Sequence, residues 1–209
     1  LRVTRDGGFF RRRLLPAVTE IVQAYYRGTR YGIHADDDTL ITAGDPETQL
    51  TWMDARCNGV SFTPRHGKAV EVNALWYNAL CICREGVTGK ARRHYERLAE
   101  AAAASFNALF WNESGGYLYD CVHPDGWVDP AVRPNQIFAV SLPFSPLDAS
   151  RCRAVVNCVQ EYLLSPYGLR SLSRDDKNYQ PYYRGDPFAR DRAYHQGTVW
   201  SWLIGPFVE

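Results

Sequence analysis

The chain has 209 residues, of which 45% are hydrophobic and 22% are charged, a composition typical of a single globular domain. Its 24 basic and 23 acidic side chains leave a net charge of +1, which gives no electrostatic basis for binding nucleic acid or an anionic membrane. Six cysteines lack zinc-site spacing, and no apolar run is long enough to span a bilayer. We therefore expect no metal, no cofactor, no membrane partner and a cytoplasmic location with reduced cysteines.

Apolar residues recur at helical spacing in six segments. The expected helices cover residues 14–27, 72–85, 90–111, 134–142, 148–162 and 195–207. Gly28 and Gly86 follow the first two helices as stop signals, and Asp148 is the expected N-cap of the fifth. Sustained strand alternation is absent from the sequence, and residues 115–121 are expected to form a small hairpin at most. The pattern predicts an all-α fold.

The connections between the expected helices alternate in length. Short links at 86–89 and 143–147 separate long links at 29–68, 112–133 and 165–193. Loops longer than about a dozen residues are uncommon in compact domains unless they have a function. If the helices pair as antiparallel hairpins, the long links all emerge on one face. This arrangement favours an α/α toroid, with a plain helical bundle as the alternative.

The long links carry most of the chain's clustered aromatic, acidic and arginine side chains, and 13% of all residues are aromatic. A concave face of this composition suits a neutral, polyhydroxylated ligand. Carbohydrate is the ligand class that we expect, although the same aromatics would also serve to pack the loops onto the helices.

One segment, Gln-Leu-Thr-Trp-Met-Asp-Ala-Arg at residues 49–56, places a carboxylate two residues after a tryptophan. Glycoside cleavage needs one carboxylic acid to protonate the leaving oxygen and a second carboxylate to activate water or attack directly. Asp54 is the candidate acid, and Trp52 is expected to form an apolar wall beside it or to stack on the sugar. The alternative is that Asp54 caps a turn.

Lys68, Glu71 and Asn73 lie where the first long link returns to the second expected helix. This position at the rim makes them candidate substrate-binding residues. A glutamate in the first turn of a helix is also favoured by the helix dipole alone.

Arg133, Asn135 and Gln136 open the fourth expected helix, and His195 opens the sixth. The first three are suited to holding sugar hydroxyls, or equally to capping the helix. His195 is suited to donating to a sugar hydroxyl or to a catalytic carboxylate, whereas a lone histidine is more often a structural residue.

Several motifs, taken together, give a resemblance to a known family. They are Thr-Trp-Met-Asp-Ala at 51–55, Thr-Pro-Arg-His-Gly-Lys at 63–68, Val-Glu-Val-Asn-Ala-Leu-Trp-Tyr-Asn at 70–78, Arg-Pro-Asn-Gln-Ile-Phe-Ala at 133–139, Ser-Leu-Pro-Phe at 141–144, Gly-Leu-Arg-Ser-Leu at 168–172 and Tyr-His-Gln-Gly-Thr-Val-Trp at 194–200. In order and spacing the chain resembles bacterial and archaeal glycogen-debranching enzymes of the amylo-α-1,6-glucosidase type.

The resemblance implies an (α/α)6 toroid of the glucoamylase-like, six-hairpin kind. It implies inverting hydrolysis of α-1,6-linked glucose at the branch points of glycogen or another branched α-glucan, with Asp54 as the general acid. The residues expected to line the glucose pocket are Lys68, Glu71, Asn73, Arg133, Gln136, His195 and Gln196.

The chain departs from the family pattern in its number of helices, six where the resemblance implies about twelve. A glutamate that acts as general base in the family falls in a later portion than residue 209. We therefore expect residues 1–209 to be part of one glucosidase domain that is truncated at both ends and lacks the base. Two alternatives stay open: another α/α-toroid glycosidase, trehalase-like or glucosidase-I-like, or a non-catalytic glycan-binding toroid, against which the intact Asp54 argues.

Overall fold

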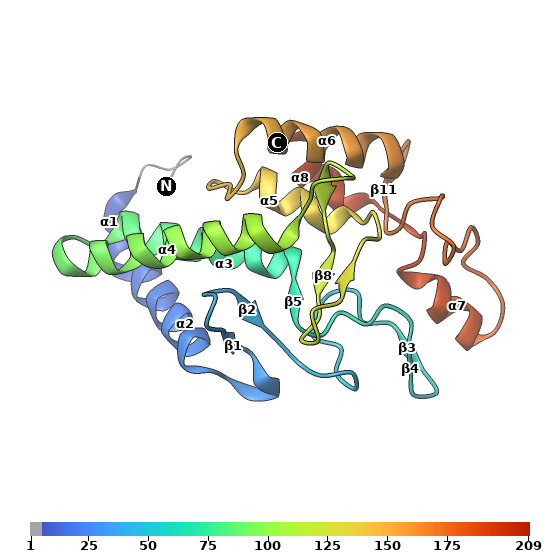
Figure 1. Ribbon diagram of the computed structural model, residues 1–209, viewed down its shortest axis with the longest axis horizontal. Coiled ribbons are helices and arrows are strands. Elements are labelled where there is room, and N and C mark those ends of the chain that lie inside the picture. The colour runs from blue at the N-terminus through green and yellow to red at the C-terminus, as the bar shows by residue number, and fades with distance from the viewer. Residues whose placement is uncertain (1–5) are drawn as a thin grey trace.

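The computed structural model describes residues 6–209 (Figure 1). Its helical elements, in chain order, are α1 (Gly7–Phe9), the π-helical turn η1 (Phe10–Leu14), α2 (Leu15–Arg27), η2 (Arg30–Gly32), α3 (Val70–Gly86), α4 (Gly89–Phe110), η3 (Pro134–Ile137), α5 (Phe138–Ser141), α6 (Ala149–Leu163), α7 (Pro187–Tyr194), η4 (Ser201–Leu203) and α8 (Ile204–Val208).

The expected all-α toroid is wrong, because the described residues also form five small sheets. Their strands are β1 (His34–Ala35), β2 (Ile41–Thr42), β3 (Arg56–Cys57), β4 (Val60–Ser61), β5 (Lys68–Ala69), β6 (Trp111–Asn112), β7 (Tyr117–Leu118), β8 (Cys121–Val122), β9 (Val128–Asp129), β10 (Leu164–Ser165), β11 (Gly168–Arg170) and β12 (Val199–Trp200). A strand of two or three residues is too short to show the apolar–polar alternation by which strands are recognised.

The core is built on the antiparallel pair α3 and α4, which are joined by a short turn and lie side by side (Figure 1). One face of α4 is buried through Tyr95, Ala99, Ala102, Phe106 and Phe110, a spacing of three and four residues that forms a single apolar stripe. Helix α3 is buried on more than one face, because it packs against α2 and α5 as well as α4.

Most of the expected helices are confirmed, and the last is not. Asp148 caps α6 by accepting from the backbone N–H groups of Ser150 and Arg151. The expected helix over 195–207 is replaced by irregular backbone, strand β12 and the short elements η4 and α8. Helix α7 instead forms within the expected link, where Asp186 accepts from the N–H of Ala189 and Pro187 occupies the first helical position.

The small sheets join the long links to one another. Strand β5 pairs with β8, so that Lys68 lies opposite Val122 and Ala69 opposite Cys121. Strand β11 pairs with β12, which brings Leu169 opposite Trp200. In Figure 1 the α3–α4 turn is at the left edge, whereas the β3–β4 and β8–β9 hairpins and α7 gather on the right. These parts of the long links therefore lie away from the α3–α4 turn.

Two further findings concern the described part of the chain. No helix within it is long and apolar enough to cross a membrane. The six cysteines are all free thiols, and four of them are buried.

Candidate active site

Asp54 lies in the link between β2 and β3, at a position without regular secondary structure. Its neighbours Met53 and Ala55 are buried, at 1% and 8% exposure, whereas the Asp54 side chain is 61% exposed. The buried side chains of Met53 and Ala55 anchor the chain on both sides of Asp54, and the carboxylate between them is open to solvent. The turn-capping alternative has no support in the hydrogen bonds of the described residues, where Asp54 caps no turn.

His195 is the side chain that faces this carboxylate, with its Nε2 3.7 Å from Oδ1 of Asp54. His195 is the residue that follows α7, and its side chain is almost fully buried. Neither ring nitrogen has a hydrogen-bond partner within the described residues. Burial lowers the pKa of His195 to about 4, against the opposing effect of Asp54. The imidazole is therefore neutral near pH 7, and the contact is not an ion pair under those conditions.

Trp52 and three other aromatic rings surround the pair. Trp52 stands edge-on to His195, Trp200 and Trp202, with ring centroids 5.1, 5.8 and 5.1 Å away. Trp200 stacks on His195 at 5.8 Å, and Tyr194 contacts both of these rings. Trp202 is 47% exposed, so this cluster presents an aromatic surface to solvent close to Asp54.

Arg133 joins the segments that carry these residues. Its Nη1 donates to the backbone carbonyls of Ser171 and His195, at 3.1 and 2.8 Å. Its Nη2 donates to Oε1 of Gln196 at 2.9 Å, and Gln196 in turn donates to the carbonyl of Phe62 at 2.6 Å. Burial lowers the pKa of Arg133 from its ordinary value. The guanidinium thus holds the backbone at His195 in place through its hydrogen bond to the carbonyl of that residue.

A buried ion-pair network continues from Arg133. Arg65 makes a two-armed pair with Glu71, both N–O distances being 2.5 Å, and its Nε donates to Oδ2 of Asp120 at 2.6 Å. The Nε of Arg133 lies 3.7 Å from the same oxygen. Burial alone would lower the pKa of Arg65, but Asp120 and Glu71 together raise it well above its ordinary value.

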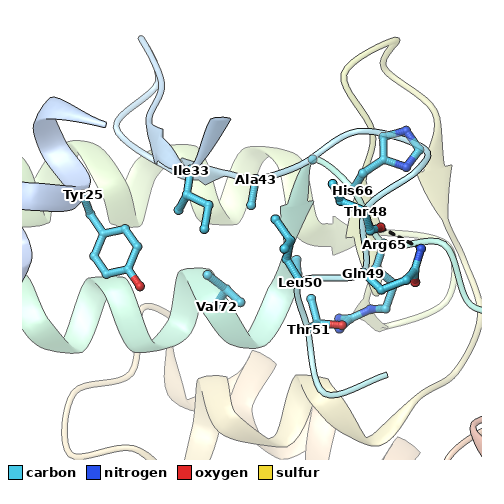
Figure 2. A pocket seen from close by; sticks show the side chains of 12 residues that line it. Tyr25, Ile33, Ala43, Thr48, Gln49, Leu50, Thr51, Arg65, His66 and Val72 are labelled. Carbon is cyan, nitrogen blue, oxygen red and sulfur yellow. Dashed lines mark hydrogen bonds between the residues drawn. The ribbon is translucent and has the colours of Figure 1, made fainter. Parts of the chain in front are cut away.

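A separate hollow of about 110 Å³ is lined in part by residues 49–51, which precede Trp52. Figure 2 shows Tyr25 and Val72 at its apolar end and Gln49, Arg65 and His66 at its polar end. Asp54 is not among the residues that line it.

Comparison with known proteins identifies the family. All 209 residues, 1–209, match the family model described as amylo-alpha-1,6-glucosidase. The chain belongs to this family. The glycogen debranching enzyme of Saccharomyces cerevisiae (strain ATCC 204508 / S288c) is similar, at 27% identity over 230 aligned residues that cover 87% of this chain. The chain spans only 15% of the length of that relative.

A solved structure shares the fold of this amylo-alpha-1,6-glucosidase family member. The GH78 family rhamnosidase of Bacillus sp. GL1 matches with a TM-score of 0.54 at 20% identity, over 75% of this chain and 15% of the rhamnosidase. At this identity the likeness concerns the fold alone. Together with the five sheets, it replaces the all-helical toroid that was expected from the sequence.

The predicted site residues divide into two sets in this family member. Trp52, Asp54, Arg133, His195 and Gln196 come together as described above. Glu71 reaches that group only through Arg65 and Asp120. The role of each in binding a substrate stays a prediction.

The other three predicted residues form separate contacts within the protein. Lys68 pairs with Asp38 and Asp36, at 2.5 and 3.0 Å; burial alone would lower its pKa, but the two carboxylates raise it. Asn73 bonds both backbone groups of Ile41. Gln136 accepts from the backbone N–H of Leu118 and donates to the carbonyl of Arg133.

The sequence predicts Asn135 as a residue that holds sugar hydroxyls, whereas its side chain is fully buried and bonds Trp52 and Asp120. Sequence reasoning missed Trp202 and Asp120 as parts of this site. Trp202 falls in an expected helix, where its contact with Trp52 has no sequence signal, and Asp120 follows an aromatic run that indicates a hairpin arm. A buried carboxylate of this kind is recognisable only when its partner arginine, here 55 residues away, is known.

Proposed function

We propose that this chain carries the general acid of a glycosidase that removes α-1,6-linked glucose from the branch points of glycogen or another branched α-glucan. Membership of the amylo-alpha-1,6-glucosidase family supports the substrate class. The observation that carries the assignment of the acid is the exposed carboxylate of Asp54, set beside Trp52 and facing the neutral imidazole of His195. We infer a cytoplasmic location from the same kinship.

The chemistry follows from these positions. The carboxylic acid of Asp54 gives its proton to the glycosidic oxygen, the bond from that oxygen to C1 breaks, and the bonding electron pair stays on the leaving oxygen. In an inverting reaction water attacks C1 from the opposite face and loses its proton to a second carboxylate. Glu71 and Asp120 are both paired with Arg65, so we assign neither of them as that second carboxylate.

Neutral His195 suits this role for Asp54. An imidazolium at 3.7 Å would favour the ionised carboxylate, which has no proton to give. Because burial keeps the ring neutral near pH 7, the acid faces a group that carries no charge. The exposed face of Trp202 offers an apolar surface on which the face of a sugar ring can rest.

The test is glucose release from a branched limit dextrin by the full-length gene product and its Asp54→Asn variant. We expect release by the wild type and a loss of at least about 10² in the variant. Asp37→Asn is the matched control, since Asp37 is an exposed carboxylate in the same long link, and it should keep wild-type activity. Equal release by wild type and D54N would refute Asp54 as the acid. No release by the wild type would refute the α-1,6-glucosidase assignment.

A further inference from the structure

Asn135 occupies a buried position between Trp52 and the ion-pair network. Its side chain is fully buried, and each arm of the amide has a partner. Oδ1 accepts from the indole Nε1 of Trp52 at 2.7 Å. Nδ2 donates to Oδ1 of Asp120 at 2.7 Å and approaches the sulfur of Met53 at 3.5 Å.

The orientation of this amide is imposed by its neighbours. The carboxylate of Asp120 only accepts, and it is held in place by Nε of Arg65 at 2.6 Å. The NH₂ group of Asn135 must therefore face Asp120, which leaves the amide oxygen for the indole of Trp52, a group that only donates. An ionised aspartate here would set two carboxylates together. A leucine would leave the indole N–H of Trp52 without its acceptor and would remove one donor from Asp120, which still accepts from Arg65.

Two of the three residues that Asn135 contacts, Trp52 and Met53, are the two that precede Asp54 in the chain. Since Asp54 itself is largely exposed, its place is set through the backbone of Trp52 and Met53. We propose that Asn135 is a positioning residue that ties the Trp52–Asp54 segment to the buried Arg65–Asp120 ion pair. The catalytic part of this inference rests on the proposed role of Asp54 as the acid.

Two substitutions of Asn135 distinguish a role of its hydrogen bonds in positioning Asp54 from a role of its volume in packing. Asn135→Leu keeps the approximate volume and removes both hydrogen bonds. Asn135→Asp keeps both bonds only while its carboxyl is protonated, because the acid then accepts from Trp52 and donates to Asp120. The charged and titratable groups in this network are Asp120, Arg65 and Arg133, with Asp129 and Glu71 behind them.

The expected result is a split between kcat and KM and a specific pH profile. N135L should lower kcat by about 10², since a displacement of about 1 Å has this effect, with a smaller change in KM. The kcat of N135D relative to wild type should rise at least about tenfold between pH 8 and pH 5, as the new carboxyl takes up its proton. N135L should stay low at both values. A wild-type kcat in N135L, or a flat ratio for N135D, would overturn the proposal.

A readout that needs no activity keeps this inference distinct from the proposed function. The indole N–H signal of Trp52 in NMR, assigned by its loss in Trp52→Phe, should shift and exchange faster with solvent in N135L. It should return toward its wild-type position in N135D at low pH. An unchanged signal in N135L refutes the positioning role even if the enzyme is active.

If the wild type releases no glucose but the signal moves as expected, the α-1,6-glucosidase assignment fails and the Asn135 contact stands. Matched controls are Asn157→Leu and Asn157→Asp, because Asn157 is exposed on α6. Both controls should leave kcat and the Trp52 signal unchanged.

Discussion

Arg65 and Glu71 face each other as a two-armed ion pair, with Nη1 and Nη2 each 2.5 Å from a carboxylate oxygen. The pair is only six residues apart in sequence and almost fully buried. It closes the loop that leads into β5 and α3, and through Asp120 it also fixes the start of β8. The stability of this region therefore depends on charges that have no access to water.

Removing one charge from this pair should destabilise the fold strongly. For Glu71→Gln we expect a loss of about 3–5 kcal/mol, because Arg65 is left with an uncompensated part of its buried charge. Urea unfolding should show a lower midpoint with an unchanged m-value. Glu113→Gln is the control, since Glu113 is 79% exposed and pairs with Arg151 at the surface; its effect should stay within about 1 kcal/mol. Equal effects of the two substitutions would contradict this prediction.

The buried imidazole of His195 should make the fold sensitive to acid. Its pKa is about 4 in the folded protein and about 6.5 in the unfolded chain, so the unfolded state binds more protons between these values. Stability should therefore be unaffected above about pH 6.5 and should fall as the pH drops from 6.5 to 4, by about 2–3 kcal/mol in total.

Comparing wild type with His195→Gln isolates this contribution. Unfolding free energies measured at pH 7.5, 5.5 and 4.5 should decline more steeply in the wild type than in the variant. The Gln substitution removes the titrating group and keeps a polar side chain at a site where the histidine nitrogens have no partners in the described residues. Parallel curves for the two proteins would show that His195 does not titrate in this window.

Trp202 should contribute to binding more than to folding. It is 47% exposed and packs on Trp52 and Phe138, so Trp202→Ala removes a contact surface at modest cost to the core. We expect KM for a branched dextrin to rise about tenfold, equivalent to about 1.4 kcal/mol, with a smaller change in kcat. Tyr167→Ala is the control, because Tyr167 is 82% exposed in the turn between β10 and β11. A rise in KM of the same size in Y167A would argue against a specific role for Trp202.

The sequence was sufficient to predict the helices that bury a single stripe of apolar side chains. The expected helix over 90–111 agrees with α4 to within one residue at each end, since Tyr95, Ala99, Ala102, Phe106 and Phe110 repeat at helical spacing. Helix α7 has no apolar stripe that would predict it, because only Ala193 of its residues is buried. The two-residue strands escaped because pairing partners such as Lys68 and Val122 are far apart in the chain.

The candidate site was predictable in its chemistry and less so in its contacts. Trp52, Asp54 and His195 were identified from motifs and do lie together. Lys68 and Asn73 were expected at the same place, but local backbone geometry gives them other partners, Asp38 and Ile41. Which partner such a side chain bonds depends on the donors and acceptors that the fold brings near it, and the spacing of residues along the chain does not reveal these.

The site draws on three segments that are distant in sequence. Trp52 and Asn135 are 83 residues apart, and Arg133 and His195 are 62 apart. Helices α3 and α4 can pair as soon as both have been synthesised, whereas Asp54 acquires its facing histidine only when the segment after α7 has left the ribosome and docked. Until residues 195–202 have been synthesised, the carboxylate therefore lacks its facing imidazole and the Trp202 ring, so that this part of the site forms later than the α3–α4 pair.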